Sequence, residues 1–181
     1  MNMKTATTYA RNGPYYLCSF DPLMAPILAT WVKDAKELFW LAPSTSPPLT
    51  AAKVLNWQNT DVSAMVLRRD QTTEVIGYLE LNLMPSQTRH LWMGHCIIRP
   101  ERRGCGLGRL MVGLAIEDAF VRRQAESVSL VVFPDNLAAV ECYRSVGFVT
   151  VGEQFKEFQG TSQTHRMLRM SIARQQSQKR S

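Results

Sequence analysis

The sequence predicts an α/β fold in which a mixed, mostly antiparallel central sheet is flanked by helices. Three observations predict it. An apolar run over 90–98 leads into a glycine-rich turn, and apolar residues then recur at helical spacing. A β-rich run at 129–133 is followed by a second helical segment that ends near residue 148. Two strand-like runs, 64–67 and 74–83, are separated by a polar turn, which is typical of an antiparallel pair.

Length and charge limit the organisation of the chain. Its 181 residues are enough for one domain with a substantial core, which we expect over residues 1–173. The net charge is +6, and residues 166–181 hold five basic residues and no acid. The charge is therefore a poor argument for nucleic-acid binding, and no nucleic-acid partner is expected. The polar, basic end over 174–181 is expected to be a disordered tail.

The remaining elements follow from local patterns. Prolines and hydroxyl residues at 43–49 exclude regular structure there. Helical segments are expected at 21–31, 34–40 and 50–57, and a closing pair of strands at 149–152 and 164–172. The expected order after the first helices is ββββαβαββ. Periodicity alone does not distinguish this order from other α+β arrangements.

The cysteines and the hydropathy pattern exclude several classes. Cys18, Cys96, Cys105 and Cys142 form no C-x-x-C pair and have no histidine at metal-ligand spacing, so neither a metal nor a disulfide framework is expected. No stretch approaches the ~18 apolar residues of a membrane span. Residues 1–16 lack the apolar core of a signal peptide. We therefore expect a cytoplasmic protein with no membrane partner.

The glycine-rich turn predicts an anion site. Gly104, Gly106 and Gly108 allow a sharp turn and remove side chains that would block a ligand. The N–H groups that open the following helix can then point at an anion, aided by the helix macrodipole. Four arginines surround the turn, which suits a ligand with several phosphates: Arg99, Arg102, Arg103 and Arg109.

Two familiar phosphate loops do not match this turn. A Walker loop needs lysine and then serine or threonine directly after its last glycine, but Arg109 and Leu110 follow Gly108. A dinucleotide fingerprint, G-x-G-x-x-G, requires a longer last interval than the one between Gly106 and Gly108.

The pattern Arg103-x-x-Gly106-x-Gly108, which follows Ile98-Arg99-Pro100-Glu101, instead resembles the coenzyme A loop of the GNAT acetyltransferase superfamily. A second GNAT signature, N-x-x-A-x-x-x-Y-x-x-x-G-F, is matched at Asn136, Ala139, Tyr143, Gly147 and Phe148. Helix capping explains Asn136, and a left-handed helix end explains Gly147. Neither explains Tyr143. The resemblance implies the GNAT fold and an acetyl-CoA-dependent N-acetyltransferase.

The resemblance also implies a mechanism without a metal or a covalent enzyme intermediate. A primary amine attacks acetyl-CoA directly, and Tyr143 protonates the departing thiolate. Backbone N–H groups of the strand before the loop stabilise the oxyanion. A nucleophilic cysteine is not favoured, because no ordered Cys/His pair is evident. The residues expected to bind acetyl-CoA are Cys96, Ile97, Ile98, Arg103, Gly104, Cys105, Gly106, Leu107, Gly108, Arg109 and Asn136.

The general base is not determined by the resemblance. The glutamate that the ribosomal-protein branch of the superfamily uses is replaced here by Val131. By residue type, Glu80 and His95 are the best candidates, the histidine because imidazole titrates near neutral pH. Each could equally be an ordinary strand residue or a hydrogen-bond partner.

The acceptor also stays open. It could be an aminoglycoside-like or polyamine-like molecule, or a protein amine. The protein itself is expected to be a monomer or a homodimer. In GNAT proteins the helices before the sheet line the acceptor side, so Phe39, Trp40 and Trp57 are candidates for shaping a pocket, with core packing as the alternative. A non-catalytic acyl-CoA-sensing module is the second hypothesis, although Tyr143 favours an enzyme.

Overall fold

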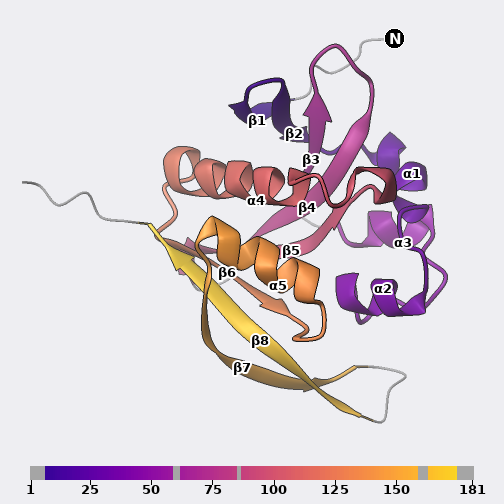
Figure 1. Ribbon diagram of the computed structural model, residues 1–181, viewed down its shortest axis with the longest axis vertical. Helices are drawn as coiled ribbons and strands as arrows, with labels where there is room; N and C mark the ends of the chain where they lie inside the picture. The colour runs from indigo at the N-terminus through magenta and orange to yellow at the C-terminus, as the bar shows by residue number, and fades with distance from the viewer. Residues whose placement is uncertain (1–6, 59–61, 85–86, 159–162, 175–181) are drawn as a thin grey trace, which may run out of the picture.

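The computed structural model describes residues 7–58, 62–84, 87–158 and 163–174 (Figure 1). Its helices and strands confirm the α/β class. In chain order they are β1 (Thr8–Asn12), β2 (Tyr15–Ser19), η1 (Pro22–Met24), α1 (Ala25–Ala29), α2 (Ala35–Leu41), α3 (Ala51–Asn56), β3 (Val62–Arg69), β4 (Val75–Met84), β5 (Gln87–Ile98), η2 (Pro100–Arg102), α4 (Leu107–Glu117), η3 (Asp118–Arg122), β6 (Ser127–Val132), α5 (Leu137–Val146), β7 (Val149–Glu157) and β8 (Thr164–Ala173).

The strands form one sheet in the order β1-β2-β3-β4-β5-β6-β8-β7. Among the described residues, all neighbouring strands pair antiparallel except β5 and β6, which confirms the predicted mixed, mostly antiparallel sheet.

The predicted strand order was wrong in two respects. Three strands, not four, separate the first helices from α4, and a β1–β2 hairpin that was not expected precedes those helices. Asn12 pairs with Tyr15 across a two-residue turn. The adjacent Asn12-Gly13 is a hairpin signal that could have revealed it.

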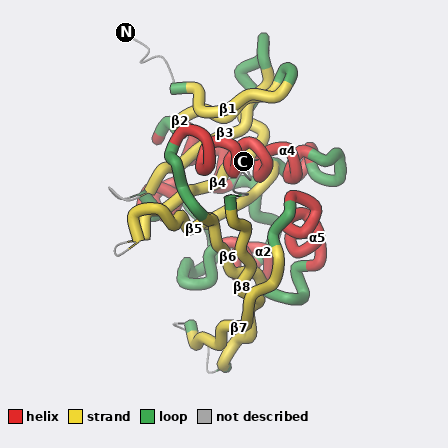
Figure 2. Tube along the Cα trace, turned by 90° about the vertical axis from the view of Figure 1, so that its left-hand side faces the viewer, coloured by secondary structure: helices red, strands yellow, loops and turns green. Residues whose placement is uncertain are grey.

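The two faces of the sheet carry separate apolar clusters. In β4, Leu79 and Leu81 pack in a cluster with Met111 and Leu114 of α4. The intervening Tyr78 points to the other face, where it packs in a cluster with residues of α1 and α3. This alternation is that of a strand covered on both sides. Figure 2 shows α4 and α5 together on one side of the sheet.

A glycine allows α4 to lie close to the sheet. A Cβ atom built on Gly77 of β4 would lie 2.6 Å from Sδ of Met111, a distance that real Cβ contacts do not show. The glycine therefore sets the depth at which α4 packs.

The sheet opens between β5 and β6. These strands pair only from His90 to Trp92 and from Ser127 to Ser129. Beyond that point β5 continues to Ile98 and pairs with β4, whereas β6 continues to Val132 and pairs with β8. The strands thus separate toward their C-terminal ends, and the opening connects the two faces of the sheet.

Neither a membrane helix nor a metal cluster is found within the described ranges. No helix there is long and apolar enough to cross a membrane. No group of three or more His, Cys, Asp or Glu side chains in those ranges could hold a metal ion. All four cysteines are free thiols.

Candidate active site

The glycine-rich turn has the geometry expected for an anion site. Gly104 and Gly106 have φ angles of +73° and +76°, and Gly106 is the N-cap of α4. Its carbonyl accepts a hydrogen bond from N–H of Leu110 at 3.1 Å. The N–H groups of residues 104–109 have no hydrogen-bond partner within the described chain. A helix start with open donors is suited to binding phosphate.

Two of the four surrounding arginines are paired with the same carboxylate rather than left free, which corrects the expectation from sequence. Arg102 donates to both carboxylate oxygens of Glu74, at 2.9 and 2.8 Å. Arg99 lies 3.5 Å from the same carboxylate and also donates to Glu101 at 2.9 Å. The hydrogen bond from Arg102 holds the pKa of Glu74 below its usual range. Sequence could not reveal this, because Glu74 lies in the turn between β3 and β4, 28 residues before Arg102.

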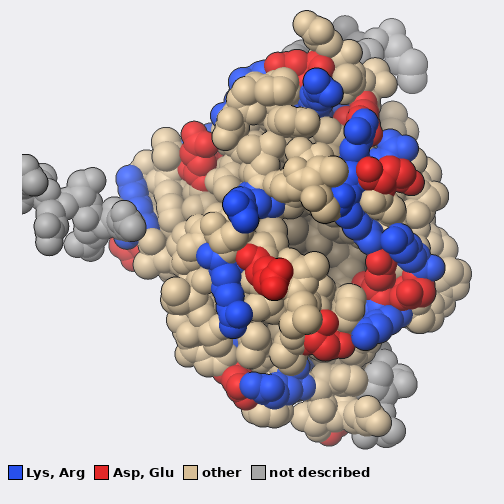
Figure 3. Space-filling model, in the orientation of Figure 1, with Lys and Arg blue, Asp and Glu red and all other residues tan. Residues whose placement is uncertain are grey.

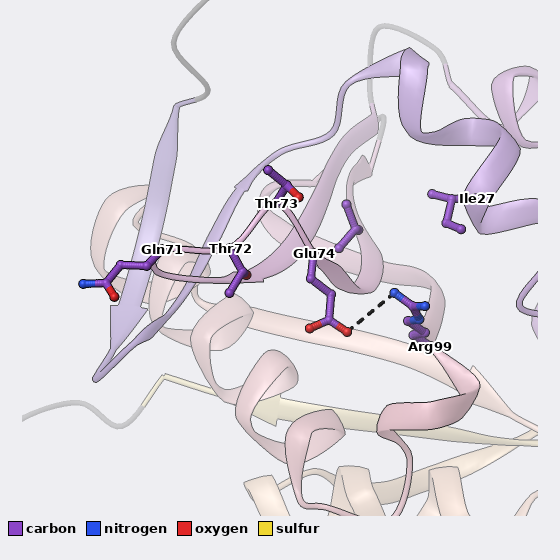
Figure 4. A pocket seen from close by; sticks show the side chains of 7 residues that line it. Ile27, Gln71, Thr72, Thr73, Glu74 and Arg99 are labelled. Atoms are coloured by element: carbon purple, nitrogen blue, oxygen red, sulfur yellow. Dashed lines mark ion pairs between the residues drawn. The ribbon is translucent and has the colours of Figure 1, made fainter.

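Glu74 and Arg99 also line an open hollow beside the β3–β4 turn (Figure 4). Its volume is about 700 Å³. In Figure 4 the carboxylate of Glu74 points toward Arg99, so the charged groups of this hollow satisfy each other. It contains neither His95 nor Tyr143, and it offers no free acid or base for a transfer reaction.

Arg103 is also engaged within the fold. Its guanidinium donates to O of Ile98 at 2.9 Å, to O of Trp31 at 2.9 Å and to Oε1 of Glu37 at 2.7 Å. The expected acetyl-CoA contact through this side chain is therefore not supported, because its donors hold α2 against the end of β5. Glu37 is itself placed by the N-terminal cap of α2, where Asp34 accepts from its N–H at 2.8 Å.

Arg109 differs from the other three. Its Nε donates to the neutral Ser145 hydroxyl at 2.9 Å, and it has no ion pair among the described residues. It is exposed on the first turn of α4. Of the four arginines, Arg109 is thus the one with charge available for a phosphate.

A cleft of about 490 Å³ lies where β5 and β6 separate. Residues 92–98 of β5 and 131–133 at the end of β6 form its walls. Four residues of α5 line it from one face: Ala138, Ala139, Cys142 and Tyr143. Figure 3 shows a hollow in the face that carries α4 and α5, with uncharged surface inside and charges of both signs at its rim.

Tyr143 is positioned by the capped helix α5. Asn136 accepts from N–H of Ala139 at 3.3 Å, and Gly147 ends the helix at a φ of +107°, as the sequence predicted. Burial raises the pKa of Tyr143 well above its usual range, with further contributions from the thiols of Cys96 and Cys142. The phenol therefore keeps its proton at neutral pH and can act as an acid.

The opposite wall contains a bulge in β5. Tyr78 is opposite Ile97 and Glu80 is opposite Gly94, so β5 has one residue more than β4 between these pairs. His95 lies there with a φ of +38°. Ile97 and Ile98 are in register with β4. Of the three expected oxyanion donors, only Cys96 falls in the bulge.

The bulge joins the two candidate bases in one hydrogen-bonded network. Nδ1 of His95 lies 2.7 Å from Oε2 of Glu80. The other carboxylate oxygen accepts from the Tyr78 hydroxyl at 2.5 Å, and that hydroxyl accepts from Gln58 at 2.7 Å. The Trp57 ring stacks on His95 at 4.2 Å. With Nδ1 held by the carboxylate, Nε2 is the nitrogen free to take a proton.

Burial separates the roles of these two residues. The Glu80 side chain is 1% exposed and does not line the cleft, whereas His95 is 25% exposed and does. Glu80 can therefore act on a substrate only through His95. Gln58, Tyr78 and Trp57 complete the network. Trp57 was a candidate for the acceptor side from the sequence, whereas nothing in the local patterns indicated Gln58 and Tyr78.

The three aromatic candidates near α2 and α3 have different positions. Trp40 lines the cleft. Phe39 packs against Phe133 at 5.0 Å, and Trp57 stacks on His95. Asn82 and Trp92, which also line the cleft, were missed. Asn82 is a polar residue within the apolar run of β4, and this interruption of the pattern could have indicated it.

A helix start with open donors, a split sheet and a buried tyrosine beside the opening are the features expected from the resemblance to the GNAT acetyltransferases. Comparison with family models agrees, because residues 28–148 match the model described as "Acetyltransferase (GNAT) family". The chain belongs to this family.

Individual relatives are more distant. The chain is 28% identical over 135 residues to a mycothiol acetyltransferase of Renibacterium salmoninarum, a match that covers 67% of this chain and 40% of the relative. The chain thus spans well under half the length of that curated relative.

Solved structures show the same fold at low identity. Spermidine N-acetyltransferase from Vibrio cholerae, in complex with CoA and spermine, has a TM-score of 0.74 at 20% identity, covering 90% of this chain and 96% of that one. Mycobacterium smegmatis RimJ, in complex with CoA-disulfide, has a TM-score of 0.71 at 16% identity, covering 93% and 85%. The ribosomal-protein-S5-alanine acetyltransferase from Vibrio fischeri has a TM-score of 0.71 at 16% identity, covering 92% and 96%.

Proposed function

We propose that this chain transfers the acetyl group of acetyl-CoA to a primary amine by direct attack, with His95 as the general base and Tyr143 as the general acid. One observation carries the proposal. His95 and Tyr143 line the same cleft from opposite faces of the sheet, at the point where β5 and β6 separate. A thioester held in this opening would have a base on one side and an acid on the other.

The coenzyme would bind on the α4 and α5 face. Open N–H groups of residues 104–109 and the charge of Arg109 suit its pyrophosphate. The arm would then follow β5 into the cleft beside Asn136 and Ala139, which line it. That path brings the thioester sulfur to Tyr143 and the carbonyl oxygen to the bulge at Cys96.

The acceptor would enter on the face of α2. An alkyl amine with a pKa near ~10 arrives protonated, so a base must remove a proton before attack. Nε2 of His95 takes that proton, and the Glu80 carboxylate at Nδ1 stabilises the imidazolium that results. The amine lone pair then attacks the carbonyl carbon, and N–H of Cys96 donates to the oxyanion.

Collapse of this intermediate breaks the carbon–sulfur bond. Tyr143 gives its proton to the departing thiolate, the proton that the nitrogen then releases restores the phenol, and His95 gives its proton to solvent. The products are the acetylated amine and free CoA. Burial of the phenol supports this role, because it keeps the proton on Tyr143 until the thiolate is formed.

The test is release of free CoA from acetyl-CoA with a panel of primary amines. We expect at least one amine to be turned over, and His95→Gln to lower kcat about 10²-fold while the Kd for acetyl-CoA, measured by calorimetry, stays within a factor of about three. If the wild-type chain binds acetyl-CoA but turns over no amine, the acyl-CoA-sensing module becomes the better hypothesis.

A further inference from the structure

We infer that the acceptor is a monoamine in which one positive charge is joined to an apolar body of about one aromatic ring, and that it is not a polycation. This inference rests on the proposed function and names the substrate class of the same cleft. It follows from the charge, lining and size of the acceptor side.

Among the residues that the structure describes, the cleft has no carboxylate left for a second ammonium group. Glu37 and Arg103 are the fully charged residues among those that line it, and they pair with each other at 2.7 Å. Asp135, which accepts from the Trp40 indole, lies 3.4 Å from Nζ of Lys36. Glu80 lies behind His95 and is bonded to it. A second ammonium group placed inside would lose its water without gaining an opposite charge, which is costly.

The acceptor side is apolar and aromatic instead. It is lined by Trp40, Leu41, Pro43, Trp92, Phe133 and Met167. The Trp40 indole is held in place, because its Nε1 donates to Asp135 at 3.1 Å and Lys36 lies 4.6 Å from its ring centre. Aromatic walls favour apolar rings, and they attract a single ammonium group through its cation–π interaction.

One polar group on this side has no partner. Oδ1 of Asn82 is buried, and among the described residues it accepts no hydrogen bond. Asn82 is directly opposite Trp92 across the β4–β5 pair, and it lies two residues along the same face from Glu80. A buried acceptor of this kind is suited to one N–H group. It can orient the amine of a bound acceptor toward His95.

The size of the cleft is consistent with this class. A volume of about 490 Å³ is within the usual range for one small-molecule ligand. The acetylated end of the coenzyme would occupy part of it. What is left suits an amine with a single ring and a short chain.

The first test compares two acceptors at saturating acetyl-CoA, with free CoA as the readout. We expect kcat/KM for phenethylamine to exceed that for spermidine by at least about tenfold. Equal or better use of spermidine would overturn this inference and leave the proposed acetyl transfer intact. Absence of turnover with both amines would count against the inference. Turnover of any other primary amine in a wider panel would then support the proposed function, and turnover of none would contradict it.

The second test adds the missing carboxylate. Leu41 lies at the end of α2 and lines the cleft, outside the His95 network. We expect Leu41→Glu to shift the ratio of kcat/KM values toward spermidine by about tenfold, and the neutral Leu41→Gln to leave that ratio within about threefold. Leu55→Glu adds the same charge on α3 away from the cleft lining, and should also leave it unchanged. Thermal unfolding checks that all three variants are folded. If they are, an unchanged ratio in Leu41→Glu would show that the cleft does not select by charge.

Discussion

His95 combines three features that an ordinary strand residue does not have. Its φ is +38°, its ring stacks on Trp57, and its Nδ1 is bonded to a carboxylate that is 1% exposed. A positive φ is uncommon for a residue with a side chain and often occurs at functional sites. Here it turns the imidazole toward Glu80 while the neighbouring Cys96 faces α5.

At the level of single residues, Tyr143 gives the sharpest prediction. Tyr143→Phe keeps the ring that packs against Phe148 at 5.9 Å and removes only the hydroxyl. We expect kcat to fall about 10²-fold, because the thiolate then leaves without a proton donor, while the Kd for acetyl-CoA changes little. Steady-state kinetics and calorimetry measure the two quantities. Undiminished turnover would mean that Tyr143 is structural and that solvent protonates the thiolate.

At the level of elements, the turn before α4 carries the coenzyme prediction. Gly106 has a φ of +76°, a conformation that costs a branched side chain roughly 1–2 kcal/mol. Gly106→Val should therefore move the N–H groups of residues 104–109 and weaken acetyl-CoA binding by well over tenfold, measured by calorimetry. Gly113→Ala, within α4 where an added Cβ meets nothing within 4 Å, serves as the control and should bind normally. Full affinity in Gly106→Val would contradict the predicted site.

The contact between Arg103 and Glu37 of α2 leads to a prediction about stability. Arg103→Gln leaves Glu37 and the carbonyl of Trp31 without their donor, and we expect it to lower the free energy of unfolding by about 1–3 kcal/mol. Arg102→Gln removes an exposed ion pair instead and should cost less than about 1 kcal/mol. Urea unfolding of both variants measures the difference. Equal losses would show that Arg103 does not hold α2 in place.

For the whole molecule, buried thiols and phenols predict lower stability at high pH. Burial raises the pKa of Cys96 to about 12 from 9.0, and burial raises those of Cys142 and Tyr143 as well. Above about pH 9 the unfolded chain loses these protons while the folded chain keeps them, so the stabilisation is complete below pH 9. It decreases by up to roughly 1.4 kcal/mol per pH unit for each such group as the pH rises.

Urea unfolding at pH 8 and pH 10 tests this prediction. The wild type should lose stability between the two values, and Cys96→Ser should lose less, because serine does not ionise in this range. An equal loss in both proteins would show that Cys96 is not the source of the dependence.

The sequence alone identified the elements that local chemistry encodes. The glycine turn at 104–108, the cap at Asn136 and the helix end at Gly147 were all predicted, because conformational freedom and capping act within a few residues. The same motifs identified the family. The proposed tail over 174–181 stays a prediction, since residues 175–181 lie outside the described part of the chain.

The tertiary structure decided which charges are free and which base reaches the cleft. Arg103 was expected at a phosphate, but Glu37, 66 residues away in the chain, takes its guanidinium. Glu80 and His95 could not be ranked as bases from the sequence, because only the bulge in β5 brings them together and exposes one of them. Local patterns encode backbone conformation over a few residues. Ion pairing and burial depend on contacts between distant segments, and these exist only once the sheet has formed.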